Sequence, residues 1–218
     1  MKILTYPQSG SVAGQTASRN RFGQYIRSRA VPVNPSSSFQ AAVRARLQTN
    51  ASAWRNLTAL QREAWASLGE QMTRTDSLGQ VYQLTGFDAY VSVNNNKVAA
   101  GDAVVSDPPL LADPGALATI TPTATIATLS VAYTATPLPA GTRAFIYASP
   151  PRSAGRIFEA DFRLITVTAA AATSPASIFT PWSARFGAPV VGQKIFVSVA
   201  TYLNGFVGVP LVSSLIVA

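Results

Sequence analysis

The residue types that usually carry out chemistry are scarce in this chain of 218 residues. It contains no Cys and no His, so it lacks the thiolate, the imidazole base and the commonest zinc ligands. Acid–base chemistry would depend on only nine carboxylates. This composition argues against a hydrolase or a transition-metal enzyme. We expect a protein that binds macromolecules, with no enzymatic activity, no cofactor and no metal.

One pair of carboxylates has the spacing of a shared site. Glu159 and Asp161 lie two residues apart in a stretch with the pattern of a strand, where alternate side chains point to the same face. A calcium site or a carboxylate dyad is one interpretation of this spacing. We favour the other, a solvated strand face whose charges are balanced by Arg156 and Arg163.

Positive charge is concentrated near the N-terminus. The first 62 residues carry nine Lys and Arg and no Asp or Glu, whereas residues 101–218 carry six basic and five acidic residues. This asymmetry predicts an anionic partner for the first part of the chain. The candidate binding residues are six arginines and two aromatic residues: Arg19, Arg21, Phe22, Tyr25, Arg27, Arg29, Arg44 and Arg46.

Two kinds of partner fit these residues. In the first, the arginines neutralise nucleic-acid phosphates, which would give a steep salt dependence and little sequence specificity. In the second, the segment lies across neighbouring protein subunits, adds a strand through residues 23–29 and sets guanidinium groups against acidic surfaces. Phe22 and Tyr25 suit base stacking and insertion into an apolar groove equally well. We favour the protein surface.

Prolines and glycines divide the chain into parts. Residues 1–36 are rich in Gly, Ser, Gln and Arg, and Pro32 and Pro35 disfavour helix before them, so we expect an extended basic arm. Residues 37–101 should form a short helical unit, and residues 102–116, with their Pro and Gly, a linker.

Three helices are expected in the helical unit. The first should run from a cap at Ser37 or Ser38 to about Trp54. The second should begin at Thr58, which has capping-box spacing with Gln61, and end near Gly69. A hairpin or irregular segment at 77–84 should precede a third helix over 86–97.

The first two of these helices are expected to pack antiparallel. Their apolar spacing would bury Trp54 and Trp65 between them, with Leu60 and Ala64 on the same inner side.

Residues 117–218 have the pattern of an antiparallel β-sandwich. Short β-branched and aromatic runs alternate with turns, and the expected strands are 118–122, 126–133, 142–148, 158–168, 193–203 and 206–217. The overall fold class is therefore α+β and multi-part: an arm, a helical unit and a sandwich.

The last part of the chain resembles fibronectin type III and related immunoglobulin-like modules. The resemblance rests on residues 193–210, where an alternating strand runs into Asn204-Gly205 and then into a final strand marked by Pro210. The tryptophan that this family places in its early strands is missing, and its tyrosine position is not clearly filled. The resemblance implies a binding scaffold for display or adhesion and names no target.

The first 100 residues resemble structural proteins of tailed-bacteriophage virions. The resemblance is carried by the order of several pieces, namely residues 9–14, 19–29, 33–35, 53–65 and 85–96. It implies a structural component of the particle, with no catalytic residues. We expect a capsid decoration or minor capsid protein that binds the major capsid protein or another virion protein, as a homo-oligomer or a lattice-bound multimer. A tail, collar or fibre-attachment component is the alternative.

The expected location is the virion, after synthesis in the host cytoplasm. Neither a signal peptide nor an apolar run of the roughly 20 residues that span a bilayer is recognisable.

Overall fold

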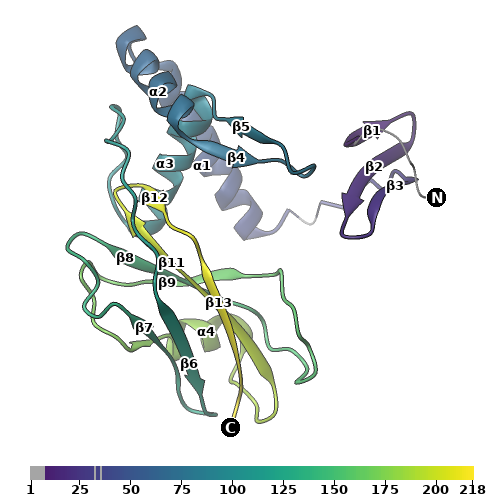
Figure 1. Ribbon diagram of the computed structural model, residues 1–218, viewed down its shortest axis with the longest axis vertical. Coiled ribbons are helices and arrows are strands. Elements are labelled where there is room, and N and C mark those ends of the chain that lie inside the picture. Colours follow the sequence, from purple (N-terminus) through teal and green to yellow (C-terminus); the bar gives the residue numbers. More distant parts are fainter. Residues whose placement is uncertain (1–7, 32, 35) are drawn as a thin grey trace. The chain divides into compact units, whose positions relative to one another are not determined.

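The computed structural model describes residues 8–31, 33–34 and 36–218 (Figure 1). The chain divides into two compact units. The first comprises the described residues up to Val91 together with Ser106–Pro108, and the second comprises Ser92–Val105 and Pro109–Ala218. The division therefore runs through a helix, whereas the sequence prediction placed the boundary at residues 102–116.

The first unit begins with a three-stranded antiparallel sheet. Its strands are β1 (Gly10–Val12), β2 (Gln15–Asn20) and β3 (Gly23–Ser28), in the order β1-β2-β3. The prediction of an extended arm is therefore wrong for this stretch. The reason is the two-residue turn at Ala13 and Gly14, whose φ angles of 48° and 77° are typical of the tight turns that suit a β-hairpin.

Two helices follow, and both begin where the sequence predicts. α1 (Ser38–Arg55) is capped by Ser37, and α2 (Ala59–Gln71) by Thr58. Each has a complete capping box: Gln61 N donates to Thr58 Oγ1 at 3.2 Å, while Thr58 N donates to Gln61 Oε1 at 3.0 Å. The paired bonds satisfy amides that a helix start leaves without partners.

The aromatic core of the first unit is built around Tyr90 of α3 (Gly86–Ala100). The rings of Trp54 and Trp65 lie 5.4 and 5.2 Å from the ring of Tyr90. Trp65 is fully buried and its indole N–H donates to the Ser106 carbonyl at 2.7 Å.

The expected packing of the first two helices is therefore wrong in detail. The third helix supplies the ring between the tryptophans, Leu60 is 78% exposed, and Ala64 is exposed as well.

A hairpin of β4 (Thr73–Thr75) and β5 (Val81–Gln83) connects α2 to α3. Asp76 closes its turn, because Asp76 Oδ1 accepts hydrogen bonds from the amides of Leu78 and Gln80 at 2.7 and 2.9 Å. Gly86 lets α3 begin against α2: a Cβ atom there would lie 2.9 Å from the Ala66 nitrogen, inside van der Waals contact.

The second unit contains two antiparallel sheets with one shared core. The first sheet has the order β10-β7-β6, and the second has the order β12-β11-β8-β9 with β13 paired to β11. The strands are β6 (Thr119–Ala124), β7 (Leu129–Thr134), β8 (Arg143–Ala148), β9 (Arg163–Val167), β10 (Ala176–Ser177), β11 (Lys194–Leu203), β12 (Phe206–Val207) and β13 (Leu211–Ile216). Buried Val131 of the first sheet and buried Ile146 and Val197 of the second belong to the same cluster. An α+β chain with antiparallel sheets is thus confirmed.

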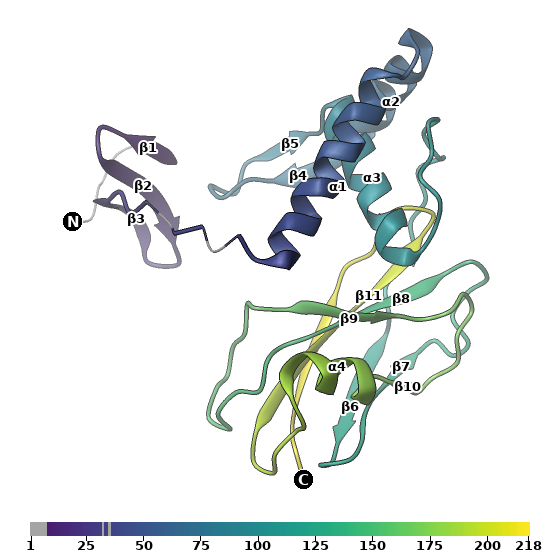
Figure 2. The ribbon, with the colours of Figure 1, turned by 180° about the vertical axis from the view of Figure 1, so that it is seen from behind.

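A short helix, α4 (Phe179–Phe186), completes this core (Figure 2). Its Trp182 is fully buried and donates its indole N–H to the Ser149 carbonyl at 3.1 Å. The sequence prediction missed both α4 and the two-residue strand β10. Pro181 lies in the first turn of α4, where a proline removes no helical hydrogen bond. Because a proline usually argues against a helix, the sequence pattern did not predict one here.

The second half of α3 is fixed to the strands of the second unit. Lys97 Nζ donates to Asn204 Oδ1 at 2.7 Å, and Asn96 Nδ2 donates to the Gly205 carbonyl at 2.9 Å. After the helix, Asp102 accepts from the Tyr202 hydroxyl at 2.6 Å and pairs with Arg143 at 2.8 Å. These polar contacts explain why the residues after Val91 belong to the β unit.

No helix among the described residues is both long and apolar enough to cross a membrane.

Replacing Trp182 with Ala should lower the free energy of unfolding of the second unit by about 3–5 kcal/mol, because it removes a fully buried ring from the shared core. Denaturant unfolding followed by circular dichroism measures the loss. Ala184→Ser, at an exposed position of the same helix, is the control and should change little. A similar stability for both variants would contradict this description of the core.

Candidate functional site

The register of the N-terminal sheet sorts the predicted binding residues onto two faces. Ala17 pairs with Ile26 and Arg19 pairs with Gln24, so these four residues lie on one face. Residues 25 and 27 of β3 alternate with them and lie on the other. We call the side with Tyr25 and Arg27 the basic face.

The basic face is open. Arg27 is exposed and Tyr25 half-buried, and Arg29 continues the alternation one step beyond β3. The Arg29 amide donates to the Gly14 carbonyl at 2.7 Å, which ties the end of this strand to the first turn. Neither Arg27 nor Arg29 pairs with a carboxylate in the described part of the chain.

The turn between β2 and β3 carries two more of the predicted residues. The Arg21 guanidinium lies 4.7 Å from the centroid of the Phe22 ring, a cation–π contact, and Phe22 is 67% exposed. The Phe22 amide donates to Asn20 Oδ1 at 2.9 Å, which holds the turn. An exposed arginine stacked on an exposed aromatic ring forms a preordered contact point at the tip of the hairpin.

Arg19 has a different role. It lies on the opposite face from Tyr25 and donates from Nη1 to the Leu78 carbonyl at 3.2 Å. The hydroxyls of Ser9 and Ser77 lie 3.3 Å apart nearby. Arg19 therefore joins the N-terminal sheet to the β4–β5 turn.

Arg44 and Arg46 do not form one patch. Both are exposed on α1, but residues two apart point to different sides of a helix. Arg44 Nη2 donates to Asn34 Oδ1 at 3.0 Å, in the segment that leads into the helix. The structure thus brings together Arg21, Phe22, Tyr25, Arg27 and Arg29 along one hairpin and separates Arg19, Arg44 and Arg46 from them.

The N-terminal sheet has almost no core of its own. From Gln8 to Val31, every residue is exposed or half-buried. A sheet this small is stable only when one of its faces is apolar and packs against another element. Its order therefore depends on the turns and on the Arg19 contact.

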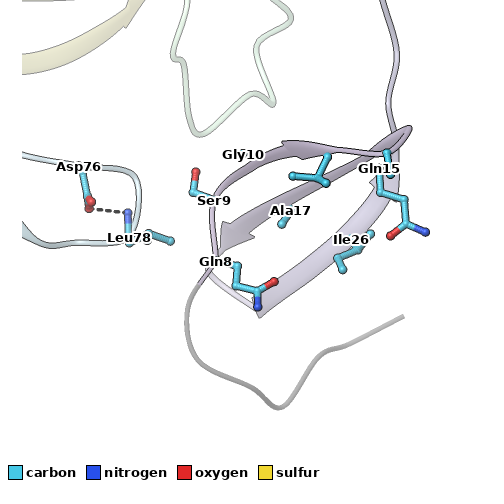
Figure 3. Close-up of a pocket in the computed structure, with 10 residues that line it drawn as sticks. Gln8, Ser9, Gly10, Gln15, Ala17, Ile26, Asp76 and Leu78 are labelled. Atoms are coloured by element: carbon cyan, nitrogen blue, oxygen red, sulfur yellow. Dashed lines mark hydrogen bonds between the residues drawn. The ribbon is translucent and has the colours of Figure 1, made fainter.

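The face opposite the basic face forms one wall of a groove (Figure 3). The groove has a volume of about 790 Å³. Val12, Ala17 and Ile26 line it from the sheet, and Leu78 and Asp76 line it from the β4–β5 turn. The sequence analysis did not predict this groove, because the residues of its two walls lie 50 to 70 positions apart along the chain.

The carboxylate pair considered as a metal site is occupied by arginines. Glu159 is buried, with 1% of its side chain exposed, and Oε2 pairs with Arg152 Nε and, at 3.3 Å, with Arg156 Nε. Glu159 Oε1 also accepts the amides of Ala160 and Asp161 at 2.9 Å.

The predicted balance by Arg156 and Arg163 is confirmed, since Asp161 pairs with Arg163 at 2.8 Å. The prediction of a solvated strand face is wrong for Glu159, because this residue is buried in a loop. The sequence analysis also missed the ion pair of Arg152 with Glu159.

The arginines keep Glu159 ionised. Burial alone would raise the pKa of its carboxyl, but the hydrogen bonds from Arg152 and from two backbone amides, with the positive charge of Arg152, lower it to about 2 from an ordinary 4.5. Among the described residues, no three His, Cys, Asp or Glu side chains are grouped closely enough to hold a metal ion. The Glu159 cluster is best described as a structural clamp on its loop.

The clamp makes the stability of the second unit depend on pH. Because the pKa of Glu159 is lower in the folded chain than in the unfolded one, its contribution is complete above about pH 5 and is lost as the pH falls towards 2. Glu159→Gln should lower the free energy of unfolding at pH 7 by about 1.5–3 kcal/mol. It should also flatten the pH dependence between pH 5 and 2, as measured by denaturant titrations at each pH. Equal slopes in both proteins would show that the clamp does not act in this way.

Comparison with protein-family models, with curated proteins and with solved structures finds no match to this chain. Its function therefore has to be argued from its own residues.

Proposed function

We propose that this chain is a non-enzymatic structural protein of a tailed-phage particle, held to its partner by the first unit and displaying the second. The observation that carries this proposal is the unbalanced charge of the N-terminal hairpin. Its arginines have no carboxylate within the first 62 residues, and none of them pairs with one elsewhere among the described residues. A surface of this kind is suited to an anionic partner.

The partner we favour is an acidic protein surface. β3 is an edge strand, so its outer backbone groups are available for a further strand. Tyr25 and Phe22 can fill apolar depressions beside it while Arg21 and Arg27 meet carboxylates. Strand pairing, aromatic burial and charge-assisted bonds together offset the entropy lost when the hairpin is fixed.

Within the particle, we propose a capsid decoration or minor capsid protein. This placement rests on the resemblance of the first 100 residues to virion proteins. A tail, collar or fibre-attachment component would use the same two-part organisation, and fitting the chain into virion density distinguishes these locations. Repetition on a symmetric lattice would strengthen weak individual contacts.

A nucleic-acid-binding module is the second candidate. The observation that favours it is the stacked Arg21–Phe22 pair next to Tyr25 and Arg27, since arginines beside aromatic rings also bind single strands. This candidate predicts DNA affinity that falls by orders of magnitude with rising salt. A protein-binding hairpin should keep its target in particles emptied of DNA.

For the second unit we propose a fibronectin type III or immunoglobulin-like display module. Support comes from the strand orders: naming β6, β7, β8, β9, β10, β11 and β13 as strands A, B, C, C′, E, F and G gives sheets A-B-E and C′-C-F-G. Trp182 departs from the family pattern, because it reaches the core from a helix between E and F.

Reversing one charge on the basic face should weaken attachment more than reversing one elsewhere. Arg27→Glu should lower the affinity for particles at least about tenfold, the effect of roughly 1.4 kcal/mol, because it sets a carboxylate against an acidic partner. Arg55→Glu is the control, since it changes the net charge equally from the exposed end of α1. Co-sedimentation of labelled chain with purified particles measures both. Equal losses would point to general charge attraction.

Deleting residues 1–35 should leave the second unit folded and abolish its attachment. Circular dichroism and thermal unfolding check the fold, and co-sedimentation checks attachment. A truncated chain that joins the particle normally would overturn the anchoring proposal.

A further inference from the structure

The second unit presents two adjacent apolar side chains to solvent. Ile157 is 92% exposed and Phe158 is 71% exposed, in the connection between β8 and β9. Isolated exposed apolar residues are ordinary, but an exposed pair of this size has the character of an interface anchor. We call these two residues the knob.

The knob is held in a fixed shape. Arg156 Nε donates to the Phe158 carbonyl at 2.8 Å and lies 3.3 Å from Glu159 Oε2. Glu159 is the buried carboxylate of the clamp and pairs with Arg152. The backbone of Arg152 is in turn bridged to Lys194, the first residue of β11. These contacts hold the backbone that carries the knob, so little backbone entropy is lost on binding.

The first unit presents a groove that suits such a knob. Its walls carry Val12, Ala17, Ile26 and Leu78, and its volume of about 790 Å³ is in the range of pockets that enclose small ligands. Asp76 is the acidic residue among those lining it. Asp76 Oδ1 closes the β4–β5 turn, while Oδ2 accepts no hydrogen bond from the described residues.

Knob and groove are complementary in charge as well as in polarity. Arg156 lies directly before the knob, and its Nη1 group has no partner among the described residues. Asp76 offers a carboxylate at the groove. The knob is therefore an apolar pair beside an arginine, and the groove combines apolar side chains with the Asp76 carboxylate. Among the described residues, the two side chains of the knob are exposed and the groove is a hollow.

We propose that the knob of one copy of this chain enters the groove of a second copy. The contact is heterologous, since different surfaces meet, so an open series of copies keeps one free groove at one end and one free knob at the other. Such a contact builds a ring or an open row. It goes beyond the anchoring function, because it uses the face of the N-terminal sheet opposite the basic face and requires no particle.

Sedimentation velocity of the purified full chain over a range of concentrations tests the proposal. The sedimentation coefficient of the unaltered protein should rise with concentration. Ile157→Ser with Phe158→Ser removes the knob, and Ala17→Trp fills the groove. Each should remain monomeric, as established beside circular dichroism spectra that show the native fold.

Mixing the two variants gives the sharpest readout. The groove-filled variant still has a knob and the knobless variant still has a groove, so an equimolar mixture should form one-to-one dimers and nothing larger. Ile126→Ser, at another exposed apolar position of the second unit, and Ser18→Trp, on the opposite face of β2, are the matched controls and should associate like the unaltered protein.

Three results would overturn the proposal. The first is an unaltered chain that stays monomeric up to about 1 mM, which corresponds to a contact weaker than roughly 4 kcal/mol. The second is a knobless variant that associates like the unaltered protein. The third is an equimolar mixture of the two variants that stays monomeric. Because these measurements contain no particle, their failure leaves the anchoring function intact, and loss of particle binding by Arg27→Glu leaves self-association intact.

Discussion

Positive charge without carboxylate partners is the main physical constraint on the N-terminal hairpin of the first unit. No acid occurs in the first 62 residues, and the hairpin arginines stay free of ion pairs among the described residues. The same hairpin buries no side chain completely. Mutual repulsion of its charges and the lack of a core both favour binding to something anionic, since both costs fall when a partner covers the basic face.

The second unit is organised by the opposite principle. Its two sheets share a dense apolar core closed by Trp182, and most of its arginines pair with carboxylates of the same unit, as in the clamp of Glu159 with Arg152 and Arg156. A unit with its own core is expected to fold without a partner, and the Glu159 clamp holds the backbone of one of its loops. A first unit with little core and a second unit with a full core fit the proposed anchored and displayed protein.

Local signals in the sequence predicted local structure well. The expected cap at Ser37 or Ser38 and the capping-box spacing of Thr58 located two helix starts, and alternation located most strands of the β unit. Two of the failures involve contacts between elements that are far apart in the sequence: Tyr90 lies between two tryptophans of other helices, and Leu78 meets Arg19 from a separate hairpin. The contact of Arg152 with Glu159, seven residues away in the same loop, was missed as well. The Ala13–Gly14 turn was missed because only Gly14 is a typical turn residue.

We expect the N-terminal hairpin to gain stability when an acidic partner covers its basic face. Amide hydrogen exchange of residues 10–28, compared between the free chain and the chain bound to DNA-free particles, tests it most directly. Exchange should be fast in the free chain and strongly slowed in the bound chain, most of all along β3. Equal exchange in both states would contradict it.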